Sequence, residues 1–119
     1  MLDIVHRALA APLELSIELL RRGIFTSDEQ AEFLELLSKQ GRPMPPRHLG
    51  CVRFATLLAQ ADTQLAARAV LRGLVRPKEL AWIYHLLHFQ KSNDKRDELT
   101  RIVERALEGR KGNVRTKRR

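Results

Sequence analysis

Side chains that could carry out chemistry are few in this sequence, and their spacing does not build a catalytic or metal-binding motif. His85 and His88 lie three residues apart in a helical stretch, a spacing compatible with metal ligation. No carboxylate or thiol stands at a suitable distance in sequence to complete a site, so surface or packing histidines are expected. Cys51 and His48 have the same spacing, and a buried or idle thiol is favoured over a nucleophile pair.

The sequence also lacks a glycine-rich phosphate loop, and its acidic residues are scattered along solvated helix faces. It therefore predicts no catalytic residue, no bound metal and no cofactor. A protein that binds a partner is expected rather than an enzyme, and the elements that would form its binding surface have to be found from the pattern of the whole chain.

The composition favours one helical domain. A chain of 119 residues suits a single domain that buries roughly two-thirds of its unfolded surface. The strong helix formers Leu and Ala dominate the apolar residues, while aromatic residues make up only 5%. No apolar run is long enough to span a bilayer, and the first residues lack the layout of a secretory signal. A single cysteine, Cys51, cannot form an internal disulfide, so a cytoplasmic protein is expected.

Positive charge is concentrated at one end of the chain. The formal net charge is +8, from 22 Lys and Arg against 14 Asp and Glu. Six of these basic residues lie in 110–119, which contains no acidic residue: Arg110, Lys111, Arg115, Lys117, Arg118 and Arg119. We expect a nearly neutral folded domain over 1–109 and a basic tail over 110–119. The tail is either solvated and disordered, or in contact with phosphates or an acidic partner.

Helical periodicity runs through most of the chain, and the helix-breaking residues fall between the periodic stretches. Gly23 suits a helix C-terminus, Thr26 to Glu29 form a capping-box pattern, and residues 41–46 are the clearest loop. The expected helices are 2–22 with a bend at Pro12, 28–39, 47–61, a fourth capped by Asp62 or Thr63 and ending at Gly73, 77–90 starting with Pro77, and 95–108 closed by Gly109.

Short connections between the helices favour antiparallel neighbours. The sequence therefore predicts an all-α fold of about six helices in three antiparallel hairpins. The stretch from Leu80 to Phe89 is apolar on nearly every face, which requires cover on more than one side. This stretch is either the central element of the core or is partly turned toward a bound partner.

The sequence also matches itself at two offsets. At an offset of 50 residues, Arg22-Gly23, Glu29 and Leu36-Leu37 meet Arg72-Gly73, Glu79 and Leu86-Leu87, although chance also produces such matches in a Leu-rich helical chain. Residues 79–108 resemble a tetratricopeptide repeat, with Trp82 and Phe89 as its aromatics and a poorer copy at 47–77. Two folds stay open: tetratricopeptide-like hairpins that Trp82 and Phe89 pack together, or a compact helical bundle.

The layout of three hairpins in so short a chain resembles a family of small tetratricopeptide-like chaperones, which hold the needle subunit of bacterial type III secretion systems. Gly23 and Gly41, which bracket one helix, and Pro77, five residues before Trp82, carry this resemblance. It covers most of the chain at the level of spacing, and the chain departs from the family in being more basic. The resemblance implies a chaperone or adaptor with a protein partner.

In such hairpins the first helix of each pair lines a concave groove. The residues expected to line it are Cys51, Ala55, Leu58, Leu80, Ile83 and Leu87. An apolar strip of this kind suits an amphipathic helix of a partner, since burying one Leu or Ile contributes about 1.5–3 kcal/mol before ordering costs. Alternatively, the same side chains form the core of a closed bundle. Ile83→Asp would separate the two, because it spares the fold only if Ile83 lies in a groove.

Nucleic-acid binding is the second hypothesis for the function. Arg68, Arg72 and Arg76 recur every fourth residue on one helix edge and could line a phosphate track, together with the basic tail 110–119. The segment 69–84 has the outline of a helix-turn-helix, but its second helix offers apolar side chains where a recognition helix needs polar ones. A small basic regulatory protein that binds RNA or DNA without sequence preference is the expectation in this case.

Overall fold

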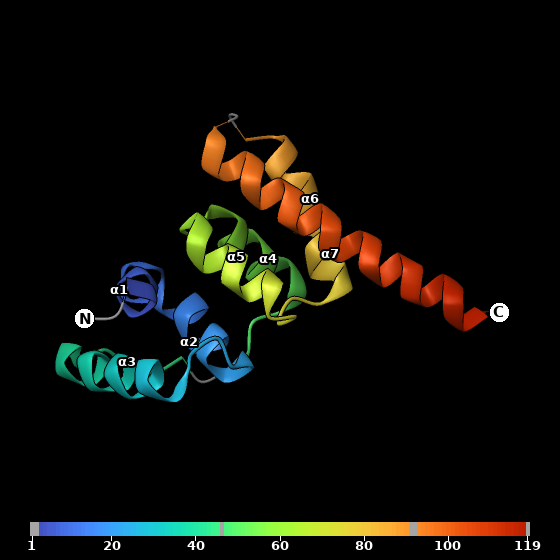
Figure 1. The fold of residues 1–119 in the computed structure, drawn as a ribbon. Coiled ribbons are helices and arrows are strands. Elements are labelled where there is room, and N and C mark those ends of the chain that lie inside the picture. Colours follow the sequence, from blue (N-terminus) through green and yellow to red (C-terminus); the bar gives the residue numbers. More distant parts are fainter. Residues whose placement is uncertain (1–2, 46, 91–92, 119) are drawn as a thin grey trace.

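The computed structural model describes residues 3–45, 47–90 and 93–118, with side chains described as far as Gly109. Over these ranges the chain forms α-helices and no strand, so the all-α fold is confirmed (Figure 1). The helices are α1 (Asp3–Ala10), α2 (Leu13–Arg22), α3 (Ser27–Gln40), α4 (Cys51–Gln60), α5 (Thr63–Leu71), α6 (Pro77–His88) and α7 (Asp94–Arg118).

The helix expected over 2–22 is in fact two helices, so the described ranges contain seven helices rather than six. The break falls at Pro12, which lacks the N–H needed to continue a helix and is instead tolerated at a helix start. The carbonyl of Pro12 accepts the first hydrogen bonds of α2, and the hydroxyl of Ser16 donates to the carbonyl of Ala8 at 2.5 Å. These bonds give the carbonyls of Ala8 and Pro12 their partners at the turn between α1 and α2.

Short-range signals set several other helix ends. Thr26 caps α3 with the expected capping box: its hydroxyl accepts the N–H of Glu29 at 3.3 Å, and the Glu29 carboxylate accepts the N–H of Thr26 at 2.9 Å. Gly23 adopts the left-handed conformation after α2, with φ of 95°. The expectation that Gly109 ends the last helix is wrong, because α7 continues through it.

The first six helices form two three-helix units with the same layout. In unit 1 (α1–α3) the first helix packs against the second and the third, and unit 2 (α4–α6) repeats these contacts. Corresponding helices start 50 residues apart, α2 at Leu13 and α5 at Thr63, then α3 at Ser27 and α6 at Pro77. The structure thus follows the offset of 50 residues, and its helices are arranged as two three-helix units rather than three hairpins.

Buried positions follow the same offset. Phe33 and Leu37 of α3, for example, correspond to Ile83 and Leu87 of α6, and all four are buried. The buried residues of unit 1 that have a buried counterpart 50 residues later are Ile4, Val5, Ala8, Leu15, Ser16, Leu19, Phe25, Glu29, Phe33 and Leu37. The two units therefore fill their cores from the same positions with different side chains.

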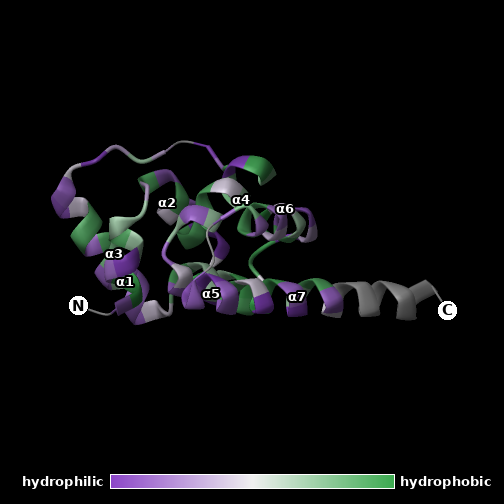
Figure 2. Ribbon diagram, turned by 90° about the horizontal axis from the view of Figure 1, so that it is seen from above, coloured by the Kyte–Doolittle hydropathy of each residue, from purple (hydrophilic) through white to green (hydrophobic). Residues whose placement is uncertain are grey.

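The two units meet through a reciprocal contact, since α1 packs on α5 and α2 packs on α4. The last helix, α7, packs on α5 and α6 and so covers a face of unit 2. The connection from α3 to α4 runs along the side of the molecule opposite α5 and α7 (Figure 2). None of the helices in the described ranges combines the length and the apolarity needed to cross a membrane.

Candidate functional site

The residues expected to line a groove lie in the core of unit 2 instead. Each of five apolar members of the set is at most 2% exposed: Ala55, Leu58, Leu80, Ile83 and Leu87. The helices that carry them, α4 and α6, pack against each other, and α7 packs on α6. Cys51, at the start of α4, is half-buried. This burial corrects the expectation of an open groove, because these five side chains hold unit 2 together and leave no strip for a partner to cover.

The arginine stripe of α5 is largely used inside the molecule. Arg68 donates to the carboxylate of Glu29 at 2.6 Å, and Arg72 donates to the carbonyl of Ile24 at 2.9 Å. Both contacts tie α5 to the start of α3 in unit 1. The side chain of Arg76 is exposed. Arg68 is therefore not free for a phosphate track, because its charge is paired with Glu29. Arg72, by contrast, is exposed and gives one hydrogen bond to Ile24, so the track through Arg72 and Arg76 stays a prediction.

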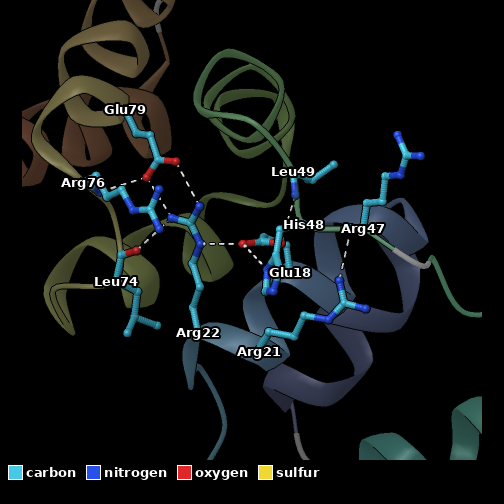
Figure 3. Close-up of polar contacts among 9 residues, drawn as sticks. All are labelled: Glu18, Arg21, Arg22, Arg47, His48, Leu49, Leu74, Arg76 and Glu79. Carbon is cyan, nitrogen blue, oxygen red and sulfur yellow. Dashed lines mark hydrogen bonds and ion pairs between the residues drawn. The ribbon is translucent and has the colours of Figure 1, made fainter.

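Arg22 stands at the centre of a buried ion network between the two units (Figure 3). Its Nη1 and Nη2 donate to the two carboxylate oxygens of Glu79 at 2.7 and 2.9 Å, and its Nε donates to Glu18 at 3.0 Å. The guanidinium carbon lies 3.7 Å from the centroid of the Phe54 ring. The Glu79 side chain is fully buried, with 0% exposure. Bidentate pairing of this kind supplies the hydrogen bonds that a buried carboxylate needs.

The same network fixes the connection that leads from unit 1 into unit 2. The Glu18 carboxylate accepts the N–H of Leu49 at 3.1 Å and lies 3.2 Å from Nδ1 of His48. Arg21, next to Arg22 in the chain, donates to the carbonyl of Pro45 at 2.8 Å. Side chains of α2 therefore hold the residues before α4 on their path across the molecule.

Hydrogen bonds in the network lower the pKa of both of its carboxylates. Burial alone raises the pKa of Glu79, but the hydrogen bonds from Arg22 and from the N–H of Arg76 outweigh that effect. The pKa of Glu18 is also lowered. Burial raises this pKa, but the hydrogen bonds from Arg22 and from the N–H of Leu49 outweigh burial. The pKa of Arg22 is raised, because its two carboxylate partners outweigh the burial that lowers it. The three groups are therefore ionised at neutral pH.

A pair of arginine contacts shows that the two units face each other symmetrically. Arg22 donates to the carbonyl of Leu74 at 3.0 Å, and Arg72, its counterpart 50 residues later, donates to the carbonyl of Ile24. Ile24 is in turn the counterpart of Leu74. Each unit thus offers an arginine to the same backbone carbonyl of the other, as units related by an approximate two-fold axis do. We assign these two carbonyl contacts, with the Arg22–Glu79 and Arg68–Glu29 ion pairs, to joining the units.

The histidines and the cysteine do not assemble into a reactive centre. The ring of His88 packs edge-on against Tyr84, with the ring centroids 4.4 Å apart, and His85 is exposed. His48, which lies in the connection between α3 and α4, contacts Glu18 of α2 instead. In the part of the chain that the structure describes, no group of three His, Cys, Asp or Glu side chains is placed to hold a metal ion.

Three large apolar side chains in or next to α4 and α6 are exposed. Val52 is 59% exposed, Trp82 is 42% exposed and Phe89, which follows α6, is 87% exposed. Trp82 lies across α4, because its Nε1 donates to the hydroxyl of Thr56 at 3.2 Å. Positions seven residues apart share one side of a helix, which places Phe89 two turns beyond Trp82. We call Val52, Thr56, Trp82 and Phe89 the aromatic face. Its exposure corrects the expectation that Trp82 and Phe89 pack hairpins together.

The aromatic face was missed in the sequence because both aromatics matched positions that pack in a tetratricopeptide repeat. The offset of 50 residues carries a signal that would have found it. At that offset Trp82 and Phe89 stand at the positions of Glu32 and Lys39, which are charged. A position that is charged in one unit and uncharged in the other is expected to point outward in both.

The basic tail cannot be placed against a partner. Its charged side chains lie outside the described residues: Arg110, Lys111, Arg115, Lys117, Arg118 and Arg119. Both the division of the chain at residue 109 and the contact of the tail with nucleic acid therefore stay predictions.

Comparison with known proteins gives no assignment. No protein-family model matches the sequence, and no curated protein or solved structure matches it. The resemblance to needle-subunit chaperones accordingly stays a prediction, and any functional conclusion rests on the geometry of the chain itself.

Proposed function

We propose that this chain is a protein-binding adaptor or chaperone whose aromatic face docks an amphipathic helix of a partner. The observation that carries the proposal is the exposure of Trp82 and Phe89 on one side of α6, with Val52 exposed one turn before Thr56, the α4 residue that Trp82 contacts. Aromatic side chains contribute much of the binding energy of protein interfaces and are enriched there. The proposal keeps the class of partner that the sequence predicts and moves the binding site from the core to this surface.

The spacing on α6 supports a helical partner. Trp82 and Phe89 present two anchors two turns apart, and a helix laid along α6 meets them with side chains at matching intervals. Burial of one large apolar side chain contributes about 1.5–3 kcal/mol, so three such contacts offset part of the ordering cost of binding. A helix with an apolar stripe therefore gives this face the cover that it lacks.

Charges around the aromatic face indicate the polarity of the partner. Within α4 and α6 the sequence has one carboxylate, Glu79, and it is buried against Arg22. Lys78 of α6, by contrast, is exposed, and the exposed Arg53 of α4 is paired with Glu14 of α2. An acidic rim on the partner helix is favoured by this arrangement, since complementary charges speed association and fix register. The resemblance to needle-subunit chaperones adds a helical secretion subunit as one candidate of this kind.

The test uses two designed helical peptides with the same apolar stripe, one with a glutamate rim and one with a lysine rim. Trp82 is the single tryptophan of the chain, so its fluorescence reports directly on cover of this face. We expect the glutamate-rimmed peptide to shift the emission of Trp82 to shorter wavelength in a saturable titration. Labelled-peptide anisotropy should show at least about tenfold weaker binding for the lysine-rimmed peptide, a difference of about 1.4 kcal/mol.

A matched pair of variants separates docking from folding. Trp82→Glu with Phe89→Lys gives α6 the residues that α3 carries at the same positions, so it should abolish peptide binding and leave the helix content unchanged. Leu34→Lys alters an apolar residue of similar exposure, 40%, on the other unit and should leave binding intact. Equal loss in both variants would contradict the proposal.

A nucleic-acid ligand is the competing outcome of the same titrations. A single strand could stack its bases on Trp82 and Phe89, and its binding would weaken steeply as salt is added. Saturable binding of a labelled oligonucleotide that the Trp82→Glu, Phe89→Lys variant loses, with no response to either peptide, would replace the protein partner by a nucleic acid.

A further inference from the structure

A second feature lies where α4, α6 and α7 come together. A cavity of about 310 Å³ opens between the turn from α4 to α5, the end of α6 and the start of α7. Its polar lining consists of Arg96 and Asn93 from the start of α7, Gln90 from the end of α6, and Gln60 and Thr63 from the turn. Leu87 of the expected groove lines its apolar wall, and the occupant of the cavity does not depend on the proposed docking of a helix on the aromatic face.

The guanidinium of Arg96 is the unusual group in this cavity. Arg96 is only 9% exposed, yet within the described part of the chain its Nε and Nη1 are enclosed without a hydrogen-bond partner. An arginine side chain stays charged at any ordinary pH and has five N–H donors to satisfy. Burial of such a charge without an anion is costly, and native proteins seldom leave one unpaired. Arg22, which is similarly buried, shows the usual solution, because two carboxylates surround it.

The backbone around Arg96 adds to the positive character of the cavity. The N–H of Arg96 donates to Oδ1 of Asn93 at 2.9 Å, which places Asn93 as the cap of α7. The positive end of the helix dipole therefore lies at the same cavity as Arg96, partly offset by the carboxylates of Asp94 and Asp97 in the first turn of α7. The nearest acid of the turn, Asp62, is already engaged by Arg7 at 2.5 Å and by the N–H groups of Gln64 and Leu65.

We propose that this cavity binds a small oxyanion, a phosphate or carboxylate group, with Arg96 as its principal ligand. A planar guanidinium holds either group through two parallel N–H···O bonds. Asn93 and Thr63 line the same space and carry further donors, as does Gln90, whose amide nitrogen also donates to the carbonyl of Ala59 at 3.4 Å. An anion that bridges Nη2 and one of the two unpartnered nitrogens gives Arg96 a counter-charge of the kind that Glu18 and Glu79 give Arg22.

The test follows the melting temperature of the full chain while inorganic phosphate replaces chloride at constant ionic strength. A parallel titration uses acetate, so that the stronger ligand identifies the source of the oxyanion. A ligand of the folded state raises the melting temperature saturably. We expect saturation with at least one anion, together with a shift of the Arg96 Nε–H resonance in NMR spectra of the unaltered protein.

Variants on α7 separate this site from general attraction to the basic tail. Arg96→Met keeps the length of the side chain and removes its charge, so the apparent affinity should fall at least about tenfold. Arg101→Met, at an exposed position of the same helix, removes one charge elsewhere and should leave the affinity unchanged. Without added anion, Arg96→Met should melt no lower than the unaltered chain, because it removes an unpaired buried charge. No saturable response to either anion, or equal affinity in Arg96→Met, would overturn the proposal.

Discussion

Unit 1 and unit 2 bury residues at the same positions but differ in their exposed surfaces. Residues on the outer side of α3 are charged, and Lys39 pairs with Glu35 at 3.6 Å. The same positions of α6 carry His85 and Phe89. Beneath these surfaces, both units bury a large apolar residue at the same place, Phe33 in one and Ile83 in the other. The difference separates positions that fold a unit from positions that the fold leaves free, and it is the free positions of unit 2 that have become aromatic.

The units also differ in their cover. Unit 2 is covered by α7, and Leu80 of α6 is buried, whereas its counterpart Gln30 in α3 is exposed. This cover by α7 explains why the stretch from Leu80 to Phe89 is apolar on nearly every face. One set of its side chains packs into the core and beneath α7, and another set, Trp82 and Phe89, faces solvent. The stretch is therefore both a core element and a candidate binding surface.

The largest loss of stability is expected when a charge is placed in the core of unit 2. Ile83→Asp would place a carboxylate without a partner at a position that is 1% exposed. The desolvation cost of several kcal/mol is comparable to the whole stability of a small domain, so the variant should be unfolded. Trp82→Asp is the control, because the neighbouring position is exposed and should tolerate the charge. Circular dichroism and thermal melts compare the two. A folded Ile83→Asp protein would return the groove hypothesis to consideration.

Signals that act within a few residues were readable from the sequence. The capping box of Thr26 and Glu29, the left-handed Gly23 and the cap at Asp62 each depend on neighbours within one turn, and each stands as expected. The all-α class follows from the same local preferences. Pro12 shows the limit of such signals, because a proline suits both a bend within one helix and the start of a new one.

Contacts between distant residues could not be predicted in this way. Arg22 and Glu79 are 57 residues apart, and nothing near either residue announces the other. The self-match at an offset of 50 contained the information, since it aligns Arg22 with Arg72 and Glu29 with Glu79. Its meaning, two units facing each other across an approximate two-fold axis, depends on packing that one sequence does not specify. The burial of Arg96 likewise depends on where α7 docks.

A smaller but still large effect distinguishes the two arginines of the unit interface. Arg22→Met removes the partner of the fully buried Glu79, and breaking a buried pair in this way costs about 3–5 kcal/mol. Arg72→Met removes one hydrogen bond to a backbone carbonyl from a side chain that is otherwise exposed, which costs about 1 kcal/mol. Urea denaturation of both variants measures the difference. Equal losses of stability would mean that the ion pair of Arg22 with Glu79 adds nothing beyond the hydrogen bond that each arginine donates to a backbone carbonyl.

The smallest effect is the loss of stability at low pH, and it compares Glu79 of unit 2 with Glu29 of unit 1. Both have a folded pKa lowered below the ordinary 4.5, at Glu29 because Arg68 outweighs burial. A lowered folded pKa gives stability that is complete above the unfolded pKa and is lost as the pH falls through the folded one. The free energy of unfolding should thus be level near neutral pH and fall below about pH 4.5. Glu79→Gln and Glu29→Gln should each flatten that fall, by up to about 1.4 kcal/mol per pH unit. Urea denaturation at stepped pH tests this, and curves parallel to that of the unaltered chain would refute the shifts.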